Sequence, residues 1–221
     1  MNWKDRITAE KSLFQVYIKA RRVATARSNT RVAWSVFSIL GIVFAVNAYS
    51  DYPIASYGSI IATIRRIAET GFSLTTSILG FLIAGFAIFA SITKPEVFVM
   101  LAKLNHKKGG ISRLQFIFFN FLIVFVHYLA FLSVCIMVKL LLYSGGPLAG
   151  GIRIIHEYSK DIIEYSSVAV LASGAGWLAF LLMLLKSFIW NMYQAVLVTI
   201  VTGDEVQRIE NDSRRQSGAG D

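Results

Sequence analysis

The segment SLTTSILGFLIAGFAIFAS, residues 73–91, decides the fold class of this 221-residue chain. It carries no charged residue, and ten of its nineteen residues are Gly, Ala, Ser or Thr. About 20 mainly apolar residues are enough for a helix to cross roughly 30 Å of hydrocarbon, because each residue adds about 1.5 Å. The segment therefore predicts a membrane-spanning helix, and its small side chains indicate that another backbone, a ligand or a pore comes close to it.

Three further segments share this length and apolar character, so the predicted fold class is an all-α integral membrane four-helix bundle. Hydrophobic residues make up 55% of the chain, more than the roughly 45–50% of a soluble domain. All three prolines lie between the predicted spans. The transmembrane domain covers residues 32–201, and its predicted spans are 32–49, 72–92, 116–138 and 168–190, the last continuing as helix towards Val201.

The Lys and Arg residues are distributed unevenly between the two sides of the membrane that this topology defines. The formal net charge is +9, and sixteen Lys and Arg residues lie in the N-terminal segment, the second connection and the tail, against four in the other two connections. Because basic residues favour the cytoplasmic side, both termini are predicted in the cytoplasm, and the expected location is the cell inner membrane. Topology accounts for the basicity and no nucleic-acid-binding motif occurs, so no nucleic-acid partner is expected.

Residues 1–31 are predicted to form a cytoplasmic basic amphipathic helix at the membrane interface. Trp3, Ile7, Phe14 and Ile18 fall near one face at helical spacing. Five basic residues are candidates for binding anionic lipid headgroups: Lys19, Arg21, Arg22, Arg27 and Arg31. The same charges could instead act only as a topology signal, and this alternative stays open.

The connection before the second span is also predicted to be helical. Residues 56–71 keep helical apolar spacing and contain no proline, so we expect one helix that continues into the span. Arg65 and Arg66 then lie about one to two turns beyond the span. They are candidates for an outer vestibule that attracts anions, or for a pair that binds water or lipid phosphate.

The remaining connections and the tail carry weaker patterns. The second connection predicts a short amphipathic helix that ends at Gly109, and the third predicts an outer helix over residues 154–165 after a flexible glycine-rich start. The tail, residues 202–221, is polar and weakly periodic, and it is expected to be disordered.

Small residues of the second span follow each other at steps of four and three, as along one face of a helix. This seam consists of Ser73, Ser77, Gly80, Ala84, Ala87 and Ser91. At such a density of small residues, the spacing arises by chance in about one sequence of ten. Two interpretations stay open: close packing with another helix of the bundle or another subunit, or a narrow pore wetted by Ser73, Thr76 and Ser77. A stripe in the fourth span, at Ala169, Ala172, Gly176 and Ala179, could pack against the seam.

Asn120 and His127 are the intramembrane polar candidates of the third span. A titratable side chain at bilayer depth indicates a function, although a histidine can also serve as a hydrogen bond between helices. Lys186, Asn191 and Gln194 of the fourth span are interpreted as interfacial. No Asp or Glu lies within a span, so a carboxylate-coupled transporter is not expected.

These observations leave two classes of function for this chain. The sequence has no catalytic-triad order, no HExxH motif and no Gly-rich phosphate loop, and it has a single cysteine, so neither an enzyme nor a cofactor or metal site is expected. The favoured prediction is a homo-oligomeric pore or channel-like protein lined by the second span. The alternative is a membrane anchor or sensor that works with a cytosolic protein partner through its basic N-terminal and inner-loop segments. Both use the lipid bilayer, with anionic lipids, as partner.

Overall fold

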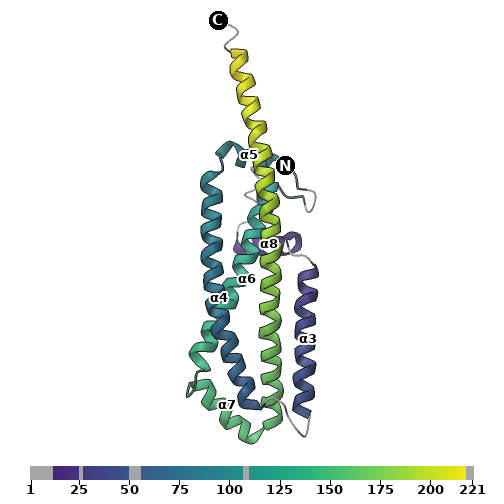
Figure 1. Cartoon of the computed structure of the whole chain (residues 1–221), viewed down its shortest axis with the longest axis vertical. Helices are drawn as coiled ribbons and strands as arrows, with labels where there is room; N and C mark the ends of the chain where they lie inside the picture. The colour runs from purple at the N-terminus through teal and green to yellow at the C-terminus, as the bar shows by residue number, and fades with distance from the viewer. Residues whose placement is uncertain (1–11, 25–26, 50–55, 107–109, 218–221) are drawn as a thin grey trace. The chain divides into compact units, whose positions relative to one another are not determined.

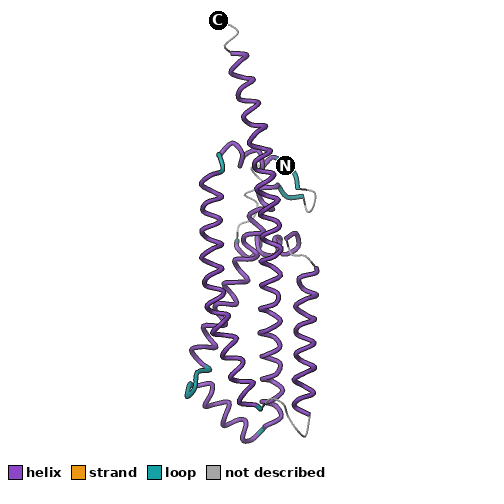
Figure 2. The backbone as a smooth tube through the Cα atoms, viewed as in Figure 1, coloured by secondary structure: helices purple, strands orange, loops and turns teal. Residues whose placement is uncertain are grey.

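The computed structural model describes residues 12–24, 27–49, 56–106 and 110–217. The regular secondary structure of this part is helical, as predicted, with one isolated bridge between Asn105 and Ser112. Figure 1 labels the helices and Figure 2 shows the same backbone by secondary structure. They are α2 (Leu13–Ala24), α3 (Arg27–Tyr49), α4 (Tyr57–Ile92), α5 (Pro95–Lys103), α6 (Arg113–Leu141), α7 (Pro147–Tyr158) and α8 (Lys160–Ser217).

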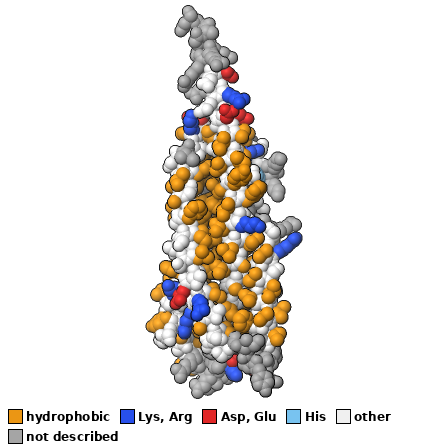
Figure 3. All heavy atoms as spheres, viewed as in Figure 1, with side chains coloured by type: hydrophobic (Ala, Val, Ile, Leu, Met, Phe, Trp, Pro, Cys, Tyr) orange, Lys and Arg blue, Asp and Glu red, His pale blue; other side chains and the backbone are white. Residues whose placement is uncertain are grey.

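Four of these helices are long and apolar enough to cross a membrane. Their apolar segments are Ser28–Val46 in α3, Gly58–Ser91 in α4, Arg113–Leu141 in α6 and Lys160–Glu205 in α8. Each overlaps one predicted span, and the helical continuation of the fourth towards Val201 is confirmed. Hydrophobic side chains cover much of the face that Figure 3 shows. This combination of length and exposed apolar surface suggests a membrane-embedded protein.

The chain divides into two compact units that share the long helices α4, α6 and α8. Unit 1 comprises Met1–Thr25, Leu82–Val124 and Leu185–Asp221, and unit 2 comprises Ala26–Phe81 and Phe125–Leu184. Each unit has a hydrophobic core of its own.

The core of unit 1 forms where α5 packs against parts of α4, α6 and α8. It consists of Phe89, Val97, Leu101, Ala102, Leu114, Ile117 and Ala195. The predicted helix of this connection is present as α5, but it ends at Lys103 instead of Gly109. The chain turns back there, because the Arg113 amide donates to the Leu104 carbonyl at 3.0 Å and Gly110 takes a positive φ of 61°. These contacts use backbone groups that a longer helix would need.

A capping box sets the start of α6. The Gln115 amide donates to Ser112 Oγ at 3.1 Å, and the Ser112 amide donates to Gln115 Oε1 at 3.0 Å. This reciprocal pair satisfies donors that a helix N-terminus leaves unpaired. The helix therefore begins at Arg113, just before the predicted span.

The core of unit 2 lies between α4, α6 and α8. It consists of Ile60, Ile64, Leu142, Val168 and Leu171. Because α4 begins at Tyr57 and runs to Ile92, the predicted continuity between the connection and the second span is confirmed.

The third connection differs from the predicted helix over residues 154–165. It forms α7, which starts at Pro147 and includes Gly150 and Gly151, two of the four glycines expected to be flexible, and the chain breaks at Ser159 before α8 begins. Proline favours the first turn of a helix because its φ is already helical. Ile152 of α7 also packs against the core of unit 2, which fixes the glycine-rich part.

The tail also differs from the expected disorder, because α8 continues to Ser217. Thr202 is buried, and a Cβ added at Gly203 would lie 3.9 Å from Val97 Cγ2 of α5. One turn later, Arg208 and Asp204 form an (i, i+4) ion pair at 3.0 Å. The contact with α5 and this ion pair both stabilise the helical conformation of the tail. The weak apolar periodicity of the tail sequence did not predict it.

Candidate functional site

The seam on α4 lies on the surface of the chain. All six of its residues are exposed, whereas Thr75, Leu79, Leu82 and Phe89, on the other side of α4, are buried. A Cβ added at Gly80 meets no atom within 4 Å. Among the described residues, the seam is thus not used for packing between helices of one chain. One of the interpretations left open by the sequence, packing within the bundle, is not observed.

Two of the seam hydroxyls, those of Ser77 and Ser91, bond to carbonyls of their own helix. Ser77 Oγ donates to the Ser73 carbonyl at 3.0 Å, and Ser91 Oγ donates to the Ala87 carbonyl at 2.8 Å. A hydroxyl bonded in this way loses no donor bond when it leaves water, and its oxygen can still accept a hydrogen bond. The seam is therefore chemically suited to hydrocarbon, to another helix or to water.

Gly176, in the small stripe of α8, packs against α3. A Cβ added at Gly176 would lie 3.2 Å from the Ala33 carbonyl oxygen and 3.2 Å from Phe37 Cβ. This glycine therefore lets the backbones of α8 and α3 approach closely. The sequence suggested that this stripe could pack against the α4 seam, but Gly176 packs against α3 instead.

Arg65 and Arg66 have different surroundings. Arg65 is half-buried, and its Nε donates to the carbonyl of Leu142, the first residue after α6. A guanidinium at a helix C-terminus satisfies a free carbonyl and lies at the negative end of the helix dipole. Arg66 is exposed. Of the two vestibule candidates, only Arg66 thus presents a freely exposed cation.

Asn120 is buried in unit 1, where it pairs with Asn191. Asn191 Nδ2 donates to Asn120 Oδ1 at 2.7 Å, and Asn120 Nδ2 donates to the Phe116 carbonyl at 2.9 Å. Asn191 was interpreted as interfacial because it lies near a span end, but its side chain also forms a hydrogen bond between α8 and α6. The sequence could not reveal this bond, because it depends on how α6 and α8 are aligned.

His127 lies in unit 2, where its ring contacts the Phe180 ring edge-on at a centroid distance of 5.2 Å. The neighbouring Tyr128 is buried, and its hydroxyl donates to the Leu181 carbonyl at 3.0 Å. Tyr128 is a polar contact between α6 and α8 that the sequence analysis missed, although a tyrosine within an apolar span is itself a signal for one.

The five headgroup candidates are divided between two helices. Lys19, Arg21 and Arg22 lie on α2, and the arginines at 27 and 31 lie on α3, which begins five residues before the predicted span. Arg21, Arg22 and Arg31 are exposed and Lys19 is half-buried. The apolar side of α2 is also exposed at Leu13, Phe14 and Ile18. The predicted contributions of residues 3 and 7, and the side chain of residue 27, lie outside the described residues.

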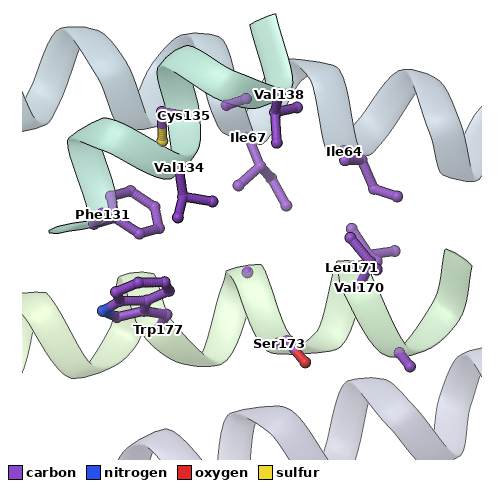
Figure 4. Close-up of a pocket in the computed structure, with 13 residues that line it drawn as sticks. Ile64, Ile67, Phe131, Val134, Cys135, Val138, Val170, Leu171, Ser173 and Trp177 are labelled. Carbon is purple, nitrogen blue, oxygen red and sulfur yellow. The ribbon is translucent and has the colours of Figure 1, made fainter. Parts of the chain in front are cut away.

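A cavity of about 330 Å³ lies in unit 2 between α4, α6 and α8 (Figure 4). Its wall is mostly apolar, and the polar groups among its lining side chains are the Ser173 hydroxyl, the Cys135 thiol and the Trp177 indole N–H. The lining residues are Ile64, Ile67, Ala68, Phe131, Val134, Cys135, Val138, Ala169, Val170, Leu171, Ser173, Gly174 and Trp177. The sequence gave no signal for this cavity, because its wall comes from three helices whose alignment no spacing specifies.

The described residues contain no group of three or more His, Cys, Asp or Glu that could hold a metal ion. Comparison with protein-family models, curated proteins and solved structures found no match to this chain.

Proposed function

We propose that this chain is a multi-pass protein of the cell inner membrane that forms homo-oligomers through α4 and a channel-like pore along the seam. The observation that carries the proposal is the exposure of all six seam residues beside a buried opposite face. In a membrane, helices associate where small residues let their backbones approach. The α4 seam offers such a surface without any cost to the packing of its own chain.

The pore follows from the chemistry of the same surface. Ser73 and Ser77 place hydroxyl oxygens on the seam, and small side chains leave room for water when several copies face one axis. The described cavity within one chain is apolar, so a polar path needs contributions from several chains. The orientation proposed with it places both termini in the cytoplasm, on the basis of the Lys and Arg distribution.

A single position on the seam tests the pore. In a Cys135→Ser background, Ser77→Cys should react with a small water-soluble thiol reagent in reconstituted vesicles, and the reaction should change ion flux. Ile83→Cys is the matched control, because Ile83 is exposed on α4 but lies outside the seam. Its thiol should face hydrocarbon and stay unreactive. An unreactive thiol at position 77, together with flux no higher than in empty vesicles, would reject the pore.

A membrane anchor or sensor is the second candidate function, and α2 is the observation in its favour. This helix exposes Leu13, Phe14 and Ile18 together with Arg21 and Arg22, a combination typical of helices that lie in the interface of an anionic membrane. A cytosolic protein partner recruited through this basic segment and the inner connection belongs to this alternative. This alternative is favoured if the thiol at position 77 does not react and the vesicles show no ion flux above that of empty vesicles.

A further inference from the structure

We infer that the cavity between α4, α6 and α8 is a binding site for one acyl chain of a membrane phospholipid. The inference goes beyond the proposed pore, since it uses none of the seam residues, and it needs only that the protein lies in a membrane. Phe131, Val134 and Ile67 point towards α8, and the Ser173 hydroxyl points away from α4 and α6 (Figure 4).

This wall excludes polar ligands. No charged residue of the described chain lines the cavity, and the Trp177 indole N–H, the Cys135 thiol and a Ser173 hydroxyl that points away are too few to replace the water that a polar solute must lose. Apolar cavities likewise hold water poorly, because a bound water needs two to four polar partners. The volume of about 330 Å³ lies within the range of about 300–1,000 Å³ that small-molecule sites occupy. The occupant that fits this chemistry is hydrocarbon.

The way into the cavity indicates where that hydrocarbon comes from. Its deep wall is buried at Phe131, Cys135 and Leu171, which are 2–3% exposed, whereas Val134 and Val170 at its edge are 44% and 53% exposed. The cavity thus opens sideways, between α6 and α8, onto an apolar surface of two helices that are long enough to span a membrane. A molecule that enters there comes from the lipid phase.

The shape of the cavity favours a chain over a compact molecule. Its wall extends over residues 131–138 of α6 and 169–177 of α8, a length of about 10–12 Å at about 1.5 Å per residue. Phospholipid acyl chains are the elongated apolar groups present at high concentration in any bilayer. One chain can enter from the side while its headgroup stays at the membrane surface.

The single cysteine of the sequence makes the test specific. Cys135 is buried and lines the cavity, so a lipid that only surrounds the protein cannot reach it. The full chain is reconstituted in bilayers that contain phosphatidylcholine with a photoactivatable diazirine in one acyl chain. After irradiation, peptide mass spectrometry locates the adducts. We expect adducts on Cys135 or Phe131 in addition to those on outward residues.

Two variants that fill the cavity complete the test. A Cβ at Gly174 would lie 3.9 Å from Ile67 Cγ2, an ordinary contact, so Gly174→Leu fits and projects into the cavity. It should lower labelling of Cys135 and Phe131 by about tenfold, as expected when roughly two chain methylenes lose their burial. Gly41→Leu is the matched control, because a Cβ there meets no atom within 4 Å and Gly41 lies outside the cavity.

The outcomes decide the inference as follows. Adducts confined to exposed residues in the unmodified chain would overturn it, and so would undiminished labelling of Cys135 in a folded Gly174→Leu protein. If that variant does not fold, Ala68→Leu fills the same cavity from α4 and takes its place. Because ion flux is not measured, failure of the pore leaves this result unaffected, and failure here leaves the pore untouched.

Discussion

The residues that join helices in this protein are few and chemically distinct. In unit 1 the Asn120–Asn191 hydrogen bond ties α6 to α8, and in unit 2 the Tyr128 hydroxyl bonds a carbonyl of α8. Gly176 lets α3 approach α8. Of these residues, the sequence singled out Asn120 as polar, Asn191 as interfacial and Gly176 as small, yet it could not name their partners. A partner depends on the alignment of two helices, and residue spacing within one helix does not contain that information.

The asparagine pair should behave as a coupled unit. Asn120→Leu or Asn191→Leu alone leaves a polar group without its partner, and each should lower the free energy of unfolding by about 1–2 kcal/mol. The double variant should cost less than the sum of both, because no amide remains unpaired. Equilibrium unfolding in mixed micelles measures the cycle. Additive effects would show that the bond contributes nothing beyond its separate side chains.

Gly176 should tolerate no larger side chain. Because its Cβ position is 3.2 Å from both Ala33 O and Phe37 Cβ, Gly176→Leu should force α3 away and lower the free energy of unfolding by about 1–3 kcal/mol. Gly174→Leu, two residues away, is the matched control, because the only atom near its Cβ position is Ile67 Cγ2 at 3.9 Å, an ordinary contact. The same unfolding measurement compares the two, and equal effects would argue against close packing at Gly176.

At the scale of whole helices, the sequence predicted the extent of a helix correctly where its apolar residues follow a clear helical spacing. The isoleucines of residues 60–67 and the absence of proline predicted the continuity of α4, and the structure confirms it. The break at Ser159 carries no glycine or proline to mark it, so the pattern missed the separation of α7 from α8. The helical tail was missed for the opposite reason, because its support comes from packing against α5 that the sequence does not display.

Helix α2 carries a prediction about the membrane surface. A peptide of residues 1–31 should bind anionic vesicles, become helical there and lose affinity at high salt. Replacing Arg21 and Arg22 by Gln should weaken binding by about 2 kcal/mol, at about 1 kcal/mol for each basic residue near such a surface. Circular dichroism and vesicle co-sedimentation measure both effects. Equal binding to neutral vesicles would remove the electrostatic part of this prediction.

At the scale of the whole molecule, the orientation of the chain in a membrane is a prediction from the distribution of its Lys and Arg residues. In a Cys135→Ser background, cysteines introduced at Ser56 and Ser159 should react with an impermeant reagent added outside the cell, and one at Lys107 should not. The reason is the concentration of Lys and Arg in the termini and the second connection. Outside labelling at position 107 would reverse the proposed orientation.

Assembly of several copies of this chain through the exposed α4 seam is the basis of the proposed pore. Its most direct test is the mass of the full protein in detergent or lipid particles, measured by light scattering corrected for bound detergent or by native mass spectrometry. One chain has a mass of 24.6 kDa. The account predicts a defined multiple of this mass, reduced towards one chain by Gly80→Leu, which places a bulky side chain on the seam. A stable particle that contains a single chain would contradict it.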